Sequence, residues 1–227
     1  DLVSKGRQIY WFVPFAIQMK KTDFDAVILD LGGVILNIDY NLTVQAFKQL
    51  GFTNFEAQYS KLQQSGLFDL LETGQVSEEE FVSSIQESIL HATHQEIIDA
   101  WNALLLDFPE GRINTVRRIA EAFPTYLLSN TNSIHYKAFN QTLKKQTEVE
   151  DIKDLFDKAY LSHEIKLRKP NKEAFQIILD EHNLDPKRTL FVDDSPQHIE
   201  GALKIGIKAY HMKDDDSLEA LFAPLLT

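Results

Sequence analysis

Five short runs of apolar, β-branched and aromatic residues set the strongest constraint on the fold of this chain. They occupy residues 26–29, 125–128, 158–161, 189–192 and 208–211. Segments with helical periodicity precede the second to the fifth run, at residues 113–123, 134–145, 171–183 and 197–205. Strands that alternate with helices at this spacing form a parallel sheet covered on both faces. The sequence therefore predicts an α/β fold.

The interval between the first two runs breaks this alternation. It contains no strand pattern, but it contains helix starts in which a hydroxyl residue is followed three positions later by glutamate. These capping boxes are Thr53 with Glu56, Ser77 with Glu80 and Thr93 with Glu96. We predict a Rossmann-like parallel sheet flanked by helices, built from residues 19–38 and 110–227, with a helical insert at 39–109. The insert would lie over the carboxyl ends of the strands, where open α/β folds bind ligands.

The composition excludes several classes of protein. The chain has no cysteine, which rules out disulfides, thiol catalysis and zinc–thiolate sites and fits a cytoplasmic location. Its net charge of −11 argues against nucleic acid or an anionic membrane surface as a partner. No apolar run reaches the roughly 18–20 residues that span a bilayer. The oligomeric state is not readable from the sequence.

The first 18 residues have a different character from the rest. They contain two early cations and a short apolar run interrupted by Pro14, a weak likeness to a signal peptide, but no small-residue cleavage site follows. The segment "MKKTDFDAVILD", which starts at Met19, reads as a natural beginning of the domain. We interpret residues 1–18 as an extension outside the fold, with a signal peptide as the alternative.

Polar residues follow four of the five apolar runs. They are Asp30 after the first run, Ser129 and Asn130 after the second, Lys169 after the third, and Asp193 and Asp194 after the fourth. The carboxyl ends of parallel strands lie at one edge of a sheet, so these side chains are expected to converge there.

The types of these residues point to phosphoryl chemistry. Carboxylates bind magnesium, a hard cation that prefers oxygen ligands. A serine hydroxyl, backbone amides at helix starts and a lysine together hold a phosphate group. A carboxylate that contacts phosphorus can attack it and form an acyl phosphate, which water then hydrolyses. Gly32 and Gly33, which follow Asp30 after Leu31, allow the tight backbone bend that such a site needs.

Four motifs in this order resemble those of the haloacid dehalogenase-like hydrolases. They are "DLGGV", "LLSN", "RKP" and "FVDD", and the resemblance runs from Asp25 to the C-terminus. The insert corresponds to the helical cap of that family. Its segment "ETGQVSEEEF" is similar to the cap of sugar-phosphate phosphatases and of the amino-terminal phosphatase domain of epoxide hydrolases.

The resemblance implies a role for each motif residue. Asp30 would be the nucleophile and a magnesium ligand, with the carbonyl of Gly32 as a second ligand. Ser129 and Asn130 would hold the phosphoryl group, and Lys169 would neutralise its charge. Asp194 would ligate magnesium, with Asp193 a ligand nearby or in the outer shell. The implied function is a Mg²⁺-dependent phosphatase that hydrolyses a small phosphorylated metabolite, with a sugar phosphate as the candidate, through an aspartyl-phosphate.

One departure from the family pattern concerns proton transfer. Most phosphatases of the family carry a second aspartate two residues after the nucleophile as general acid and base, and Gly32 stands there in this chain. A general acid typically contributes 10²–10⁴-fold to the rate. A smaller departure is His198, where relatives often have asparagine.

Three alternatives to this phosphatase remain at this stage. They are a metal-independent dehalogenase of the same fold, a phosphomutase, and a catalytically idle domain that binds a metabolite or a protein. The acidic pair Asp193–Asp194 opposes the dehalogenase. The sequence does not name the substrate; Tyr40, Phe68 and Glu72 are the candidates for side chains that reach it from the insert.

Overall fold

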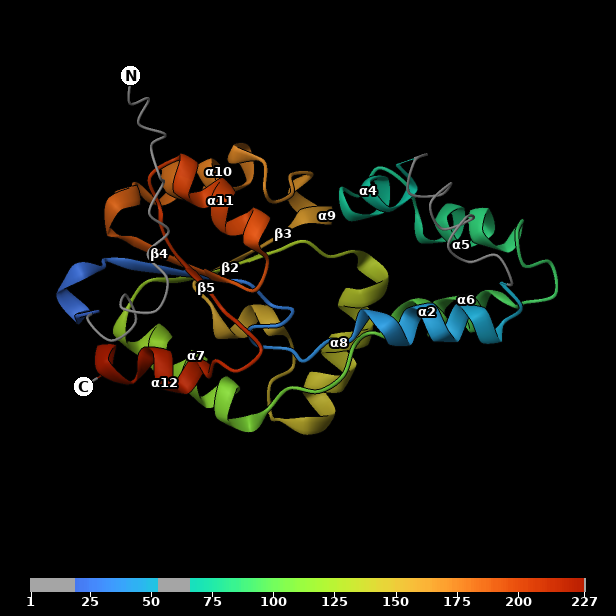
Figure 1. Cartoon of the computed structure of the whole chain (residues 1–227), viewed down its shortest axis with the longest axis horizontal. Helices are drawn as coiled ribbons and strands as arrows, with labels where there is room; N and C mark the ends of the chain where they lie inside the picture. The colour runs from blue at the N-terminus through green and yellow to red at the C-terminus, as the bar shows by residue number, and fades with distance from the viewer. Residues whose placement is uncertain (1–18, 53–65, 227) are drawn as a thin grey trace, which may run out of the picture.

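A computed structural model of the chain describes residues 19–52 and 66–226 (Figure 1). The extension predicted at residues 1–18 and the capping box of Thr53 with Glu56 lie outside the described residues, so both stay predictions. Within the described part of the chain, no helix is both long and apolar enough to cross a membrane.

The centre of the molecule is a five-stranded sheet in which all neighbouring strands are parallel, in the order β3-β2-β1-β4-β5. The strands are β1 (Ala26–Leu29), β2 (Thr125–Ser129), β3 (Lys158–Leu161), β4 (Thr189–Asp193) and β5 (Lys208–His211). All five predicted strands are present, and the predicted α/β architecture is confirmed. Because β1 is central, with β2 and β4 on either side, the residue that follows β1 lies between the ends of two other strands.

Helices cover both faces of this sheet (Figure 1). One face carries α7 (Glu110–Ala122), α8 (Ser133–Gln146) and α12 (Leu218–Phe222), and the other carries α10 (Lys172–His182) and α11 (Pro196–Lys204). Shorter pieces connect the elements: η1 (Lys21–Asp23), η2 (Ile152–Leu155), α9 (Ser162–Ile165), η3 (Pro186–Arg188) and η4 (Ala223–Leu225).

The central strand β1 is apolar throughout because it contributes to two cores. Val27 and Leu29 belong to the core beneath α7 and α12, whereas Ala26 and Ile28 belong to the core beneath α10 and α11. All four side chains are fully buried. A strand buried on both faces has no polar positions along its length, so its first polar residue falls where the strand ends.

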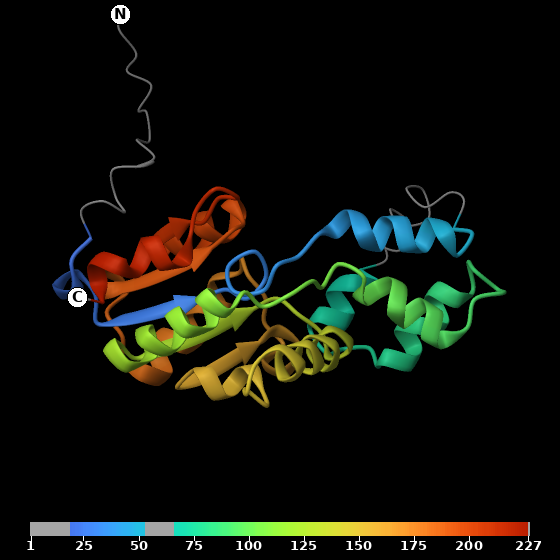
Figure 2. The same ribbon diagram turned by 90° about the horizontal axis from the view of Figure 1, so that it is seen from below.

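The four described helices between β1 and α7 form a separate group beside the sheet (Figures 1 and 2). They are α2 (Tyr40–Gln49), α4 (Leu67–Glu72), α5 (Glu78–Gln86) and α6 (His94–Asn102). They enclose a hydrophobic core of their own around Phe81, Ile97 and Trp101. The predicted capping boxes that start α5 and α6 both form: Ser77 and Thr93 each accept from the backbone N–H of the glutamate three residues on.

Two antiparallel chain segments link these helices, which we call the cap, to the sheet. The backbone N–H of Asn37 donates to the carbonyl of Asp107, and the N–H of Leu106 donates to the carbonyl of Asn37, at 2.9 and 3.0 Å. The N–H of Asp39 donates to the carbonyl of Leu104 at 2.9 Å. The proposed division at residues 38–39 falls within this pairing, and the one at 109–110 lies at the start of α7.

The interior of the cap generates a stability prediction. Phe81 is fully buried, and its ring centroid lies 4.9 Å from that of Trp101 and 6.1 Å from that of Phe68. Phe81→Ala should lower the free energy of unfolding by about 3–5 kcal/mol, measured by urea denaturation, because it leaves a cavity among these rings. The matched control Leu90→Ala, at a side chain that is 85% exposed, should stay within about 0.5 kcal/mol of the parent. Equal losses in the two variants would contradict a packed cap core.

Candidate active site

Asp30 stands directly after β1 at the start of a tightly closed loop. Its backbone N–H donates to the carbonyl of Val192 on the neighbouring strand at 2.9 Å, and the residue is 7% exposed. The N–H groups of Ile35 and Leu36 both donate to the carbonyl of Leu31, at 2.8 and 2.9 Å. This ring of hydrogen bonds fixes the backbone that follows Asp30.

Gly33 and Gly32 differ in whether the loop requires a glycine at their position. Gly33 adopts φ of +72°, the left-handed region that favours glycine, and a Cβ there would lie 2.2 Å from Oδ2 of Asp194. The carboxylate of Asp194 therefore rests against the backbone of the loop. Gly32 lies outside that region, and a Cβ there would meet only the flexible end of Ile38, at 3.1 Å. Of the two glycines, only Gly33 is required by the backbone conformation.

Lys169 is a fully buried cation that bridges two of the strand ends. Its Nζ lies 2.7 Å from Oδ1 of Asp30 and 2.6 Å from Oδ2 of Asp193. Burial alone would lower the pKa of Lys169, but the two carboxylates outweigh it and hold that pKa above its ordinary value. The side chain is therefore a permanent positive charge beside Asp30.

Asn130 holds Lys169 in this place through a two-way hydrogen bond. The backbone N–H of Lys169 donates to Oδ1 of Asn130, and Nδ2 of Asn130 donates to the carbonyl of Lys169, both at 2.9 Å. Both the oxygen and the nitrogen of the side-chain amide take part in these bonds. Asn130 thus positions the lysine, a contact that sequence reasoning did not foresee because 39 residues separate the two.

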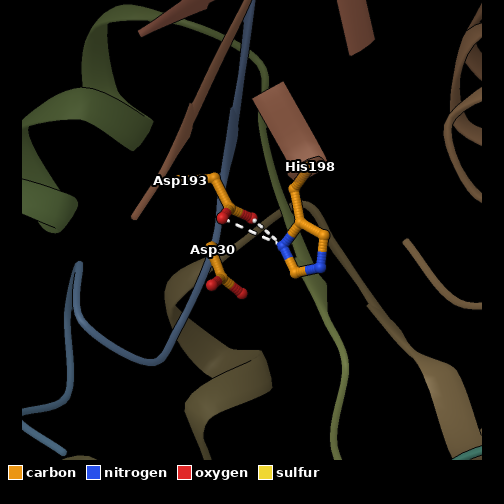
Figure 3. A group of neighbouring side chains, drawn as sticks. All are labelled: Asp30, Asp193 and His198. Carbon is orange, nitrogen blue, oxygen red and sulfur yellow. Dashed lines mark hydrogen bonds and ion pairs between the residues drawn. The ribbon is translucent and has the colours of Figure 1, made fainter. Parts of the chain in front are cut away.

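Asp193 is committed to its neighbours and has no exposed surface. Besides Lys169, it accepts from the backbone N–H of Ser195 at 2.8 Å, and Nδ1 of His198 lies 3.0 and 3.1 Å from its two oxygens (Figure 3). Burial would raise the pKa of Asp193, but Lys169 and His198 hold it below its ordinary value. His198, first noted only as a departure from the family pattern, is thus a partner of Asp193.

The charged forms of the two remaining carboxylates, Asp30 and Asp194, are disfavoured by their surroundings. Burial, and then the charge of Asp193, raises the pKa of Asp30 to about 7 despite Lys169. The pKa of Asp194 is also raised, first by burial and then by Asp193. Negative groups gathered in a poorly solvated site favour an additional cation. Asp30, Asp193 and His198 also have ligand atoms close enough to share an ion, but Asp193 and His198 already bind each other.

The structure brings the predicted site residues to one edge of the sheet. Ser129 is the last residue of β2 and is 4% exposed. The set consists of Asp30, Gly32, Ser129, Asn130, Lys169, Asp193 and Asp194. Their convergence agrees with the prediction, while the catalytic and metal-binding roles of the individual residues stay proposals.

Arg168 was not singled out by sequence reasoning, although it precedes Lys169. It forms ion pairs with Asp69 and, at 2.8 Å, with Glu72, both on cap helix α4. The only signal in the sequence was a second cation inside the "RKP" motif. Its partners lie about a hundred positions away, so the pairing was not readable from local pattern.

The sequence and the fold are similar to those of known proteins. The family model of the haloacid dehalogenase-like hydrolases matches residues 24–206. A HAD family enzyme from Bacteroides thetaiotaomicron, solved in complex with magnesium and inorganic phosphate, is 34% identical, with a TM-score of 0.78 over 88% of this chain and 99% of that chain. A predicted HAD-like hydrolase from Porphyromonas gingivalis is 26% identical, with a TM-score of 0.79 over 90% of this chain and 98% of that chain.

A curated relative adds an activity. The D-ribitol-5-phosphate phosphatase of Bacteroides thetaiotaomicron is 29% identical over 185 residues, which are 81% of this chain and 89% of the relative. The chain belongs to the haloacid dehalogenase-like hydrolase family. The resemblance first seen in the four motifs is thereby confirmed.

Gly33 allows a sharp test of the loop. Gly33→Ala and Gly66→Ala both place alanine in the left-handed region, at φ of +72° and +75°, and each should lose about 1–2 kcal/mol of unfolding free energy for that reason. At Gly66 a Cβ meets nothing within 4 Å, whereas at Gly33 it strikes Asp194. Urea denaturation should therefore show an additional loss of about 1–3 kcal/mol for Gly33→Ala alone, the cost of overpacking. Equal losses would mean that Asp194 does not rest against this loop.

Proposed function

We propose that this enzyme is a magnesium-dependent phosphatase that hydrolyses a small phosphorylated metabolite through an aspartyl-phosphate on Asp30. The observation that carries the proposal is the setting of Asp30. On one side it has the permanent cation Lys169, and near it is Asp194, a second carboxylate with a raised pKa. The phosphatase activity of the ribitol-phosphate relative and the magnesium and phosphate bound by the solved enzyme support it.

The donor set fits magnesium. Asp30 and Asp194 offer carboxylate oxygens, and the carbonyl of Gly32 in the loop between them is a third hard ligand in the proposal. Burial and the charge of Asp193 raise the pKa values of both carboxylates, and a divalent cation bound between them would offset this penalty. Asp193 remains in the outer shell, because Lys169, Ser195 and His198 already occupy its oxygens. Bound there, magnesium supplies charge neutralisation for the phosphoryl oxygens.

The residues of the chain then perform two displacements. A carboxylate oxygen of Asp30 forms a bond to phosphorus as the bond between phosphorus and the substrate's ester oxygen breaks. Lys169 and the hydroxyl of Ser129 contact the phosphoryl oxygens and stabilise their charge. Water then attacks phosphorus, the bond to Asp30 breaks, and inorganic phosphate leaves. The departing alkoxide takes a proton from solvent. The attacking water leaves its oxygen and one proton on the phosphate and returns its other proton to solvent, so that one water is consumed overall.

The substrate proposal follows from the relatives. A sugar phosphate or sugar-alcohol phosphate is favoured, since the D-ribitol-5-phosphate phosphatase spans most of this chain. A cytoplasmic location and the absence of nucleic-acid and membrane partners stay predictions from composition. The dehalogenase alternative predicts halide release without any metal, so a magnesium titration separates it from the proposal.

Removal of the nucleophile is the direct test. Asp30→Asn should lower kcat on a sugar-phosphate panel at least a thousandfold while circular dichroism stays unchanged, because an amide is a poor nucleophile. Asp25→Asn is a matched control at the other end of the same strand, where the side chain is 59% exposed. It should retain the parent rate within threefold. A kcat of Asp30→Asn within tenfold of the parent would contradict the covalent mechanism. A rate of phosphate release that does not change when magnesium or a chelator is added would contradict the proposed metal dependence.

The glycine at position 32 predicts a dependence on the leaving group. Without a general acid there, aryl phosphates, whose phenolates depart unaided, should react much faster than alkyl phosphates at saturating magnesium. Gly32→Asp should narrow the gap about tenfold or more, because Gly32 is outside the left-handed region and only Ile38 is near. The measurement is kcat/KM across phosphate esters of graded alcohol acidity. A flat series for the parent would show that the missing acid is not limiting.

A further inference from the structure

The ion pairs of Arg168 join the cap to the strand edge that carries the reaction. Arg168 follows α9 on the sheet side, and its guanidinium reaches Asp69 and Glu72 on cap helix α4. The helices α4 and α9 lie side by side, and a Cβ at Gly74, just after α4, would be 2.3 Å from the carbonyl of His163 (Figure 1). Glu72 is therefore held next to the residue that precedes Lys169.

This pairing leaves polar atoms unsatisfied. Within the described residues, neither Oε2 of Glu72 nor Nε of Arg168 makes a hydrogen bond, although both atoms are shielded from solvent. The 2.8 Å contact between Nη2 and Oε2 is an ion pair without the alignment of a hydrogen bond. A buried polar atom without a partner costs about 1–3 kcal/mol, and such atoms in a native protein call for an explanation such as a ligand.

Tyr40 connects this pair to the reaction centre. It opens α2, and burial followed by neighbouring negative charges raises its pKa to about 12; those charges are Asp30, Asp194, Glu72 and Asp193. Tyr40 is nevertheless 69% exposed. The charges of Asp30 and Glu72 both act on its hydroxyl, which stays protonated and lies within electrostatic range of the reaction centre and of α4.

Phe68, the third residue proposed from the sequence, is placed differently. Its ring stacks on Trp101, with centroids 5.3 Å apart and an interplanar angle of 7°, and it packs against the cap core. It therefore supports α4 from the inside, whereas Glu72 and Tyr40 lie toward the reaction centre.

We propose that Glu72, Arg168 and Tyr40 form a recognition site for the hydroxyl groups of the substrate's carbon chain. This site makes the enzyme selective for polyhydroxylated phosphate esters, such as sugar-alcohol phosphates, over plain alkyl phosphates, and it rests on the proposed phosphatase function. A hydroxyl group can satisfy both Oε2 of Glu72 and Nε of Arg168, because it donates to a carboxylate and accepts from a guanidinium. A substrate carboxylate would meet Glu72, Asp69 and Asp194, and an ammonium group would meet Arg168.

The test compares two substrates of equal length, D-ribitol 5-phosphate and n-pentyl phosphate, at saturating magnesium. The quantity is the ratio of their kcat/KM values. Glu72→Ala should reduce this ratio at least tenfold in favour of the alkyl ester, and Glu72→Gln, which keeps shape but not charge, should reduce it severalfold. Tyr40→Phe, which removes only the hydroxyl, should also reduce it severalfold.

The matched control is Glu78→Gln. Glu78 forms another ion pair between the cap and the sheet domain, with Lys137 at 2.7 Å, on helix α5 rather than α4. Loss of this pair should leave the substrate ratio within twofold of the parent. If Glu72→Ala lowers both kcat/KM values equally, or if Glu78→Gln shifts the ratio as strongly, Glu72 acts in cap docking and the recognition site is wrong. If the parent protein releases phosphate from neither ester, the phosphatase proposal itself fails.

Discussion

The buried ammonium of Lys169 is the interaction on which the site depends. It pairs with both Asp30 and Asp193, at the ends of the neighbouring strands β1 and β4, and so offsets part of the negative charge buried at this edge of the sheet. Removal of one partner from a buried ion group leaves an uncompensated charge and is strongly destabilising. Asn130 fixes the lysine backbone and His198 fixes Asp193, so the charge of Asp30 is held in one geometry.

The three aspartates of the site have different pKa values because their surroundings differ. Asp193 accepts from Lys169, Ser195 and His198 and has a lowered pKa, whereas Asp30 and Asp194 have raised pKa values, and in the proposed function these two bind the cation and Asp30 attacks the phosphoryl group. Gly33 makes the difference possible, because the lack of a side chain lets Asp194 lie against the loop that carries Asp30. The same division explains why Asp193 and Asp194, adjacent in the chain, take different parts in the proposed chemistry.

The cap contributes a second set of charges that faces the first. Glu72 and Tyr40 approach from the cap helices, and Arg168 approaches from the segment that also supplies Lys169. In the proposal, Lys169 therefore binds the reacting phosphoryl group, and its neighbour Arg168, which pairs with the cap, binds the rest of the substrate. Such a link makes the position of the cap matter for selectivity, while the phosphoryl chemistry stays with the sheet.

The sequence alone determined the sheet and the edge where the site forms. Strands buried on both faces are apolar along their length, so Asp30, Ser129 and Asp193 marked the strand ends, and the capping boxes at Ser77 and Thr93 marked cap helices. These signals depend on residues that are only a few positions apart, so they can be read directly from the sequence. The tertiary structure decided the partners: Asn130 with Lys169, His198 with Asp193 and Arg168 with Glu72. The first and last of these pairs join residues far apart in the chain, and all three depend on packing, whose outcome no short stretch of sequence records.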